Sequence, residues 1–203
     1  KGLYFMRIVL ASSSTYRSEL LKRLQIPFLQ ASPDIDESPL ENESPRDLVQ
    51  RLSHQKTLTL ATQFPNHLII GSDQVAVIEN NTNNCQILTK PGNKENAFKQ
   101  LSESSGKVVH FLNGLTLLNS HIGRSQTRLV TIDVHFRHLT SKEIERYIEL
   151  EQPFNCAGSF KSEGLGICLF ERLTGTDPNA LIGLPLIELV SLLKAEGVSP
   201  LSS

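Results

Sequence analysis

The chain has 203 residues, enough for one domain or two closely joined lobes with a substantial buried core. Hydrophobic residues make up 39% and charged residues 20%, which is on the low side of ordinary for a soluble globular protein and gives no sign of disorder. The formal net charge of -1 gives no overall field that would attract nucleic acid or an anionic membrane, so a polyanionic ligand would need a local cluster of cations.

Cysteine usage and hydropathy narrow the class further. Cys85, Cys156 and Cys168 lie far apart without CxxC spacing, which argues against a structural zinc site and a disulfide framework and favours a reducing cytoplasm. No apolar stretch approaches the roughly 20 residues that span a bilayer. We expect residues 1–5, before the only methionine, to be a cloning remnant, residues 6–198 to form a single domain, and residues 199–203 to be a flexible tail.

The chain begins with a predicted strand, loop and helix. Residues 7–11 are apolar, the hydroxyl-rich run 12–15 follows, and residues 16–24 have a helical pattern. Backbone N–H groups at a helix start can bind an anion, although hydroxyl residues there also form ordinary N-caps. Arg17 favours the anion site, because a cation in the first helical turn is unfavourable unless an anion is nearby.

A second predicted strand, residues 27–31, leads into an acidic loop. Asp34, Asp36 and Glu37 lie between two prolines that exclude a helix. Three carboxylates so close together are usually a solvated bend, but they also provide the hard oxygen ligands that Mg²⁺ or Mn²⁺ prefers. The sequence leaves both readings open.

The next helix has clear signals at both ends. Ser44 is a suitable N-cap, Pro45 suits the first turn, and residues 64–65 end the helix. Lys56 lies within it. A lysine on a helix is normally solvent-facing, so only its relation to other residues could make it a ligand.

A short apolar run, residues 68–70, ends in Gly71, Ser72 and Asp73 and predicts a buried strand. In an α/β sheet the carboxyl ends of strands face the ligand crevice, which would place Asp73 in a site. The alternative is that Asp73 merely starts a turn, because Gly-Ser-Asp is common in turns.

The second half of the chain alternates further elements. The polar run 79–84 is expected to be a hairpin tip without chemistry. The patterns predict a return strand at 87–91, a helix at 93–101, an antiparallel ribbon of 107–118 and 125–136, a helix at 140–150 opened by a capping box of Thr140 and Glu143, a glycine-punctuated recognition loop at 155–164, a strand at 165–173 and a closing helix at 184–196.

Two features in this half suggest chemistry only weakly. His135 and His138 would point to opposite faces of a strand and have no third ligand nearby in the sequence, so a structural role is favoured over metal binding. Cys156 has no evident basic partner, which favours a small buried residue over a nucleophile.

Six motifs together resemble one family. They are ASSSTYR at 11–17, DES at 36–38, Lys56, GSDQ at 71–74, TKP at 89–91 and AGSFKSEG at 157–164. Their order is that of the Maf proteins, and the resemblance runs from Met6 to near the end of the chain. The GSDQ and SFKSEG motifs are most similar to those of the bacterial subgroup that prefers 7-methyl-GTP. The insertion at residues 79–86 is the main departure and lies between motifs.

The resemblance implies a fold and an activity. The fold is α/β, with a mixed, bent sheet flanked by helices and a deep nucleotide cleft, as in inosine triphosphate pyrophosphatase-like proteins. The activity is that of a nucleotide pyrophosphatase, a hydrolase that cleaves a nucleoside triphosphate between the α and β phosphates and releases a monophosphate and pyrophosphate.

The resemblance also assigns roles to residues of this chain. Asp73 is catalytic, as general base or as a metal ligand that orients the attack, and Glu37 and Asp73 hold a divalent cation, Mg²⁺ or Mn²⁺. The remaining residues bind phosphate (Ser12, Ser14, Arg17, Lys56 and Lys90) or choose the base (Tyr16, Gln74 and Glu163).

A different class of function fits some of the same residues. Maf proteins are linked with septum formation, so a nucleotide-sensing regulator of cell division without important hydrolysis is the alternative. Such a binder has little use for Glu37 and Asp73 beside phosphates, which favours the enzyme. A nucleic-acid-binding module is excluded by the neutral charge and by the lack of a basic-aromatic run. A homodimer is suggested only at the level of the family.

Overall fold

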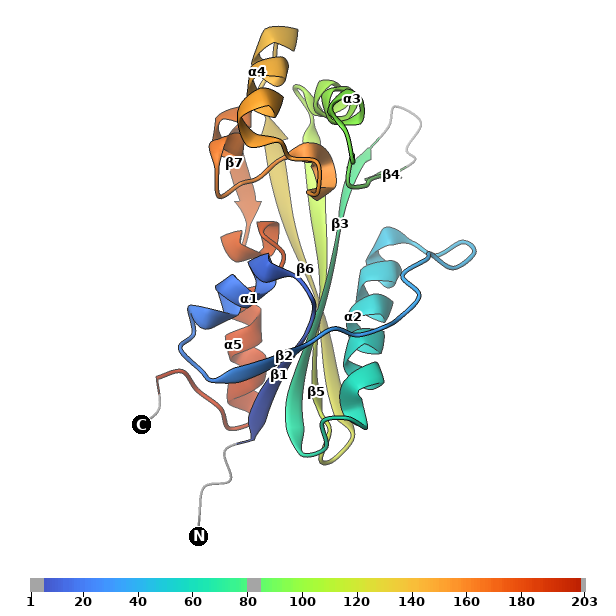
Figure 1. Ribbon diagram of the computed structural model, residues 1–203, viewed down its shortest axis with the longest axis vertical. Helices are drawn as coiled ribbons and strands as arrows, with labels where there is room; N and C mark the ends of the chain where they lie inside the picture. Colours follow the sequence, from blue (N-terminus) through green and yellow to red (C-terminus); the bar gives the residue numbers. More distant parts are fainter. Residues whose placement is uncertain (1–5, 80–84, 202–203) are drawn as a thin grey trace. The chain divides into compact units, whose positions relative to one another are not determined.

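The computed structural model describes residues 6–79 and 85–201. The expected remnant at 1–5, most of the insertion at 79–86 and the last two residues of the expected tail lie outside this part. The regular elements, in chain order (Figure 1), are β1 (Arg7–Ala11), α1 (Thr15–Lys22), β2 (Phe28–Ala31), α2 (Pro45–Ala61), β3 (His67–Glu79), β4 (Cys85–Leu88), α3 (Lys94–Ser104), β5 (Val108–Asn119), β6 (Arg124–Phe136), α4 (Ser141–Glu151), β7 (Phe170–Gly175) and α5 (Leu186–Ala195).

The strands form one mixed sheet in the order β2-β1-β3-β5-β6-β7, with β4 added to β3. β1 pairs in parallel with both β2 and β3, whereas β3 with β4 and β6 with β7 are antiparallel. The predicted α/β class with a mixed sheet and flanking helices is therefore confirmed, and the nucleotide cleft stays a prediction.

The chain divides into two compact units. The first contains residues up to 74, 113–130 and those from 183 onward, and the second contains 75–112 and 131–182. β3, β5 and β6 contribute residues to both. Each unit is described by itself below.

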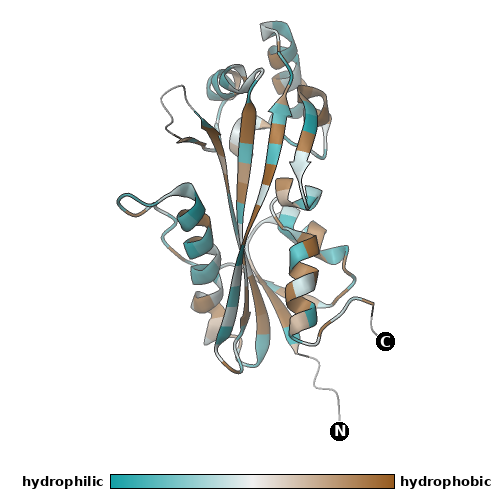
Figure 2. Ribbon diagram, turned by 180° about the vertical axis from the view of Figure 1, so that it is seen from behind, coloured by the Kyte–Doolittle hydropathy of each residue, from teal (hydrophilic) through white to brown (hydrophobic). Residues whose placement is uncertain are grey.

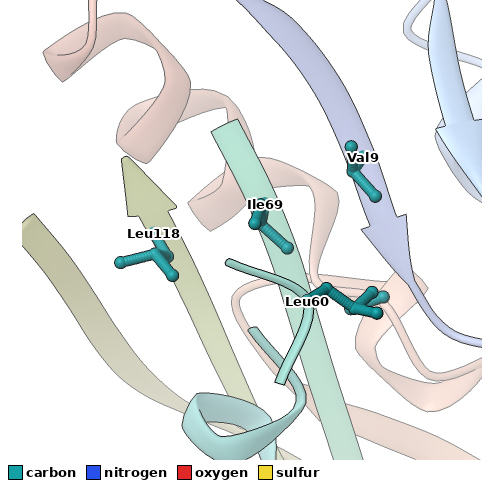
Figure 3. Close-up of a cluster of buried hydrophobic side chains, with 5 residues drawn as sticks. Val9, Leu60, Ile69 and Leu118 are labelled. Atoms are coloured by element: carbon teal, nitrogen blue, oxygen red, sulfur yellow. The ribbon is translucent and has the colours of Figure 1, made fainter. Parts of the chain in front are cut away.

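The first unit has a core on the side of the sheet covered by α2. Val9 of β1, Ile69 of β3, Leu118 of β5 and Leu60 of α2 pack together and are almost completely buried (Figure 3). α1 and α5 lie on the other face of the sheet (Figure 1). α5 is largely apolar along its length (Figure 2), which explains why it can close that face.

Two glycines allow α2 to approach the sheet closely. A Cβ atom on Gly71 of β3 would collide with the backbone carbonyl of Ser53, and one on Gly114 of β5 with that of Val49. Both carbonyls belong to α2, so the helix backbone lies directly on the strands at these points. This seating fixes the height of the α2 side chains above β3.

The second unit is built around aromatic side chains. Phe160 makes edge-on contacts with Phe111, Phe136 and Phe170, at ring-centroid distances of 5.3, 5.5 and 5.9 Å. α3 and α4 pack against each other in the same unit. The capping box of Thr140 and Glu143 at the start of α4 is confirmed, with both reciprocal hydrogen bonds present.

The predicted strand at 165–173 is wrong in its first half. Leu165–Leu169 form a 3₁₀ helix, and only Phe170–Gly175 form β7. Gly166 lies so close to the backbone of Lys161 that a Cβ atom would collide with it. This local folding of the loop onto itself overrides the apolar run that had suggested a strand.

Across residues 6–79 and 85–201, every helix is too short or too polar to cross a bilayer.

Candidate active site

The loop between β1 and α1 is tied together by its own hydroxyls. Ser14 is the N-cap of α1, because its Oγ accepts the backbone N–H of Arg17 at 3.3 Å. The Oγ of Ser12 accepts the N–H of Ser14 at 3.1 Å and a longer bond from the Arg17 guanidinium at 3.5 Å. The N-cap reading is therefore confirmed, and the anion-binding reading stays a prediction.

Arg17 is held by a residue that sequence reasoning missed. Its Nε donates to the carbonyl oxygen of Gly183 at 2.9 Å, and the same oxygen accepts from Ser72 Oγ at 3.0 Å. Gly183 has φ +122°, which disfavours any residue with a side chain. The available signal was a glycine just before the closing helix. One carbonyl thus links α1 to β3.

The electrostatic surroundings of Arg17 join it to the acidic residues. Burial lowers the pKa of its guanidinium, and the negative charges of Asp73 and Glu37 act in the opposite direction. Both predicted metal ligands therefore lie within electrostatic range of the predicted phosphate-binding arginine.

Lys56 stands at the centre of this cluster. Its side chain is only 6% exposed, and its Nζ contacts Asp73 Oδ1 at 2.6 Å and Glu37 Oε1 at 2.8 Å. The expectation that a helix lysine faces solvent is wrong here, because α2 lies directly on the sheet. A buried ammonium needs compensating charge, and the two carboxylates provide it.

The sheet register explains why Asp73 reaches Lys56. β1 ends at Ala11, which pairs in parallel with Gly71, so Asp73 lies just beyond the parallel pairing of β1 with β3. Residues His67–Glu79 form one uninterrupted strand, and the alternative that Asp73 starts a turn is therefore wrong. β1 ends beside the part of β3 that carries Asp73. Ser12, the first residue after β1, therefore lies at the same end of the β1–β3 pairing as the carboxylate.

Two carboxylates of the acidic loop have different partners: Asp36 binds within the loop, and Glu37 binds Lys56 of α2. Asp36 bonds to Ser38, whose side chain and backbone N–H lower the pKa of the Asp36 carboxyl, with the N–H at 2.9 Å from Oδ1. Glu37, whose side chain is 61% exposed, instead reaches Lys56. The loop is thus a bend that also directs one carboxylate to the lysine.

Gln74 has a buried partner that the sequence did not indicate. Its Nε2 donates to Asn113 Oδ1 at 3.2 Å, and Asn113 Nδ2 donates to the Val130 carbonyl at 3.4 Å. Asn113 is fully buried on β5, so it orients the Gln74 amide. Tyr16 lies on α1 with 43% of its surface exposed.

The remaining predicted residues belong to the second unit. Lys90 follows β4 and Glu163 lies in the loop before the 3₁₀ helix, and both are exposed. Both act on the thiol of Cys156: burial raises its pKa, Glu163 raises it further, and Lys90 lowers it. The raised pKa opposes formation of a thiolate, which agrees with a packing role for Cys156.

The loop that carries Glu163 is anchored to α4 through two backbone N–H groups and one lysine side chain. Tyr147 Oη accepts the N–H of Lys161 at 2.9 Å, Lys161 Nζ donates to the Glu151 carbonyl at 2.9 Å, and Glu151 Oε1 accepts the N–H of Leu165 at 3.0 Å. α4 therefore holds both ends of the segment and leaves Glu163 pointing to solvent.

The residues present fit a hard divalent cation only in part. Glu37 and Asp73 both contact Lys56 Nζ, so two carboxylates, the kind of ligand that suits Mg²⁺ or Mn²⁺, lie near each other around that ammonium. In the part of the chain that the structure describes, no three His, Cys, Asp or Glu side chains gather as a metal cluster. An ion at this site would thus complete its shell with water and phosphate oxygens, as Mg²⁺ usually does. Apart from this site, His135 has a side-chain partner on β7, because its Nε2 contacts Thr174 Oγ1 at 3.1 Å.

Comparisons with known proteins decide the family. A family model described as Maf-like protein matches residues 7–196. The chain belongs to the Maf family. This Maf protein is 58% identical, over 191 residues, to a protein named 7-methyl-GTP pyrophosphatase from Alcanivorax borkumensis, with 94% of each chain covered. A structural comparison finds the Staphylococcus aureus Ham1 protein at 12% identity and a TM-score of 0.45, covering 94% of this chain and 99% of that one. The motif-based resemblance is confirmed.

Proposed function

We propose that this Maf protein is a nucleotide pyrophosphatase that hydrolyses the bond between the α and β phosphates of a nucleoside triphosphate. Water is consumed, and a nucleoside monophosphate and pyrophosphate are released. The observation that carries the proposal is the contact of buried Lys56 with both Asp73 and Glu37. The 58% identity to a protein named as a pyrophosphatase supports it.

The four charged side chains of the candidate site in the first unit suit a polyanion that binds together with a metal cation. Arg17 and Lys56 are balanced by Asp73 and Glu37, so these four side chains are together neutral. A triphosphate carries about four negative charges at neutral pH. Its binding therefore calls for additional positive charge, which we assign to Mg²⁺ or Mn²⁺ held by Glu37 and Asp73. Lys90 keeps the phosphate-binding role that the family motif implies for it.

Within this proposal each residue has a physical task. Arg17 and Lys56 donate charge-assisted hydrogen bonds to phosphate oxygens, with Ser12 and Ser14 as hydroxyl donors. A divalent ion, when bound, neutralises phosphate charge and lowers the pKa of water that it binds. Asp73 accepts the proton of the attacking water or orients that water. Lys56 fixes Asp73 Oδ1 in either role.

We assign the base preference to Tyr16, Gln74 and Glu163. 7-Methylguanine carries a formal positive charge, which the face of an aromatic ring such as that of Tyr16 attracts more strongly than neutral guanine. Glu163 accepts hydrogen bonds from guanine N–H donors and adds attraction to the cation. Gln74, oriented by Asn113, supplies an amide for the base. On this basis 7-methyl-GTP is the proposed substrate.

The test is pyrophosphate release from a panel of nucleotides with Mg²⁺ or Mn²⁺. The proposal expects turnover with equal amounts of monophosphate and pyrophosphate, and the highest kcat/KM for 7-methyl-GTP over GTP, dTTP and UTP. Release of inorganic phosphate with a diphosphate product would place the cleavage at a different bond. Saturable nucleotide binding without turnover, in wild type and Asp73→Asn alike, would instead favour the sensing role.

A further inference from the structure

The segment that carries Glu37 has no regular structure of its own. β2 ends at Ala31 and α2 begins at Pro45, and the residues between them form neither helix nor strand. The Glu37 side chain is largely exposed, so burial does not fix its position. A carboxylate that must meet Lys56 from such a segment depends on how its backbone is held.

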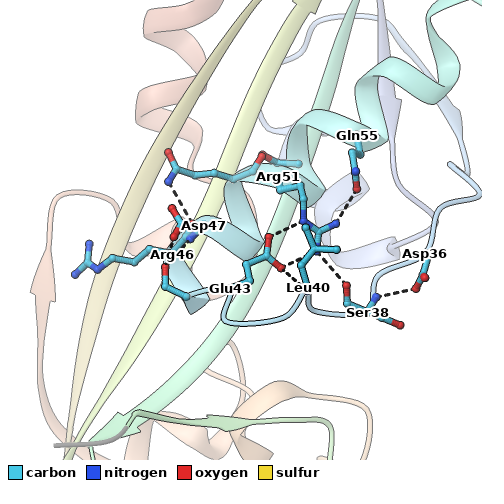
Figure 4. Close-up of polar contacts among 11 residues, drawn as sticks. Asp36, Ser38, Leu40, Glu43, Arg46, Asp47, Arg51 and Gln55 are labelled. Carbon is cyan, nitrogen blue, oxygen red and sulfur yellow. Dashed lines mark hydrogen bonds and ion pairs between the residues drawn. The ribbon is translucent and has the colours of Figure 1, made fainter.

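Arg51 of α2 makes three contacts with this segment and a fourth with its own helix (Figure 4). Its Nε and Nη2 donate to Glu43 Oε1 and Oε2 at 2.6 and 2.7 Å, which is the fork-to-fork geometry of a bidentate pair. Nη2 also donates to the Ser38 carbonyl at 3.0 Å, and Nη1 donates to Gln55 Oε1 at 2.9 Å. One guanidinium therefore binds the segment at two points and its own helix at a third.

Glu43 continues the arrangement back into the segment. Its Oε2 accepts the backbone N–H of Leu40 at 3.0 Å in addition to Arg51. The Glu43 side chain is only 6% exposed and that of Arg51 19%. Removing one partner of an ion pair that is this well shielded from water costs much more stability than removing one partner of an exposed pair.

The position of Arg51 along α2 connects the clamp to the candidate site. Arg51 holds the carbonyl of Ser38, the residue directly after Glu37, and Lys56 five residues later on the same helix contacts the Glu37 side chain. α2 itself lies directly on β3 at Gly71, two residues before Asp73. One helix therefore sets the place of Glu37 relative to both Lys56 and Asp73.

We propose that Arg51 and Glu43 are positioning residues, which clamp residues 36–43 onto α2 so that Glu37 is presented to Lys56 and Asp73. The catalytic consequence rests on the function proposed above, whereas the clamp itself does not. Neither residue needs to touch the substrate. Their effect passes through the backbone at residues 38 and 40.

The experiment compares Arg51→Lys and Glu43→Gln with wild type. Arg51→Lys keeps the charge but loses the fork, and Glu43→Gln keeps the shape but loses the charge. The matched control is Arg124→Lys. Arg124 Nη2 lies 2.6 Å from Oε1 of Glu196, and the Glu196 side chain is, like that of Glu43, almost buried, with 5% exposed. If Arg51→Lys fails to fold, Glu43→Gln alone tests the clamp.

Two readouts are taken on the same preparations. Hydrogen exchange of peptides covering residues 36–43 is expected to be at least about tenfold faster in both variants, with peptides from β3 unchanged, since the amides of Leu40 and Ser38 lose their fixed geometry. For 7-methyl-GTP, kcat is expected to fall about 10- to 100-fold, because small misplacement of a reacting group is costly. KM should change much less, and Arg124→Lys should change neither readout.

The outcomes separate the clamp from the proposed function. Unchanged exchange at residues 36–43 overturns the clamp whatever the activity. Faster exchange with unchanged kcat overturns the positioning role. Faster exchange in a protein whose wild type releases no pyrophosphate supports the clamp, overturns its catalytic consequence and contradicts the proposed function.

Discussion

The two units hold their candidate residues by different forces. In the first, Lys56 is buried and its place is set by two carboxylates at 2.6 and 2.8 Å. In the second, Glu163 is exposed, and the segment before it is anchored by Phe160, a ring packed edge-on against three other phenylalanines. The contrast extends to the two lysines of the predicted phosphate set, since Lys90 is exposed.

The difference follows from what each kind of group must do. Charges that assist bond cleavage act most strongly when they are preorganised and shielded from water. A buried lysine is tolerated only with carboxylates beside it, so the structure must build the charge cluster as a whole. A residue that selects a base can stay exposed, provided that its backbone is held by apolar packing. Substitutions in the buried Lys56 cluster should therefore mainly affect turnover, those of exposed base-selecting residues mainly substrate choice, and those in the aromatic cluster mainly stability.

Asp73→Asn should have the largest effect. It removes the carboxylate that accepts or orients the proton of water and leaves Lys56 with Glu37 as a charged partner. We expect kcat for pyrophosphate release to fall about 10²- to 10⁴-fold, the range typical of a lost general acid–base group. Asp34→Asn, an exposed carboxylate of the same segment as Glu37, serves as control and should retain activity. Comparable losses in both variants would contradict the central place of Asp73.

Phe160→Ala should weaken the second unit. Phe160 is 5% exposed and contacts three rings, so its truncation should lower the free energy of unfolding by about 3–5 kcal/mol, measured by urea denaturation. Below the unfolding transition we expect the ratio of activities on 7-methyl-GTP and GTP to change more than kcat does. A loss under about 1 kcal/mol would show that the aromatic cluster does not hold the loop.

Tyr16→Ala and Glu163→Ala should change selectivity more than rate. Loss of a cation–π contact or of a carboxylate facing a cationic base should reduce the preference for 7-methyl-GTP over GTP by about 3- to 10-fold. The measurement is the ratio of kcat/KM for the two nucleotides. Glu171→Ala, an exposed carboxylate on β7, is the control. An unchanged ratio in both variants would refute the assignment of base choice to these residues.

Acidification gives the smallest predicted effect and separates the clamp from the site. The hydrogen bonds from Arg51 hold the pKa of the Glu43 carboxyl below its usual value. A depressed folded pKa contributes stability above the unfolded pKa, about 4.3 for glutamate, that is lost as the pH falls through the folded value. Thermal unfolding of Glu43→Gln should therefore depend less on pH below about 4.3 than that of wild type. Parallel curves for the two proteins would contradict this.

Much of the architecture could be predicted because its signals are local. β1 has the predicted limits, α2 has its predicted cap and proline, and α4 has its capping box. The strand predicted at 165–173 was wrong in its first half, because the same apolar run also suits a loop that folds closely over Gly166. Sequence patterns report which residues are apolar, and they do not report which backbone lies against which.

The candidate site shows the same division. Asp73, Lys56 and Glu37 were identified by their types and by the family motifs, and Gly71 came with the strand. Gly183, Asn113 and the clamp of Arg51 and Glu43 were not identified. Each of them acts on a partner at least eight residues away along the chain, and short-range sequence patterns do not report such contacts.

The sequence by itself determined the family, the mixed α/β class and which side chains bring charge, because these depend on residue identity and short-range pattern. Only the tertiary structure decided that Lys56 is buried and shared by two carboxylates, since that depends on Gly71 and Gly114 letting α2 lie directly on the sheet. Close approach of backbones far apart in the chain is a property of packing, and packing converted a helix lysine, a strand aspartate and a loop glutamate into one cluster.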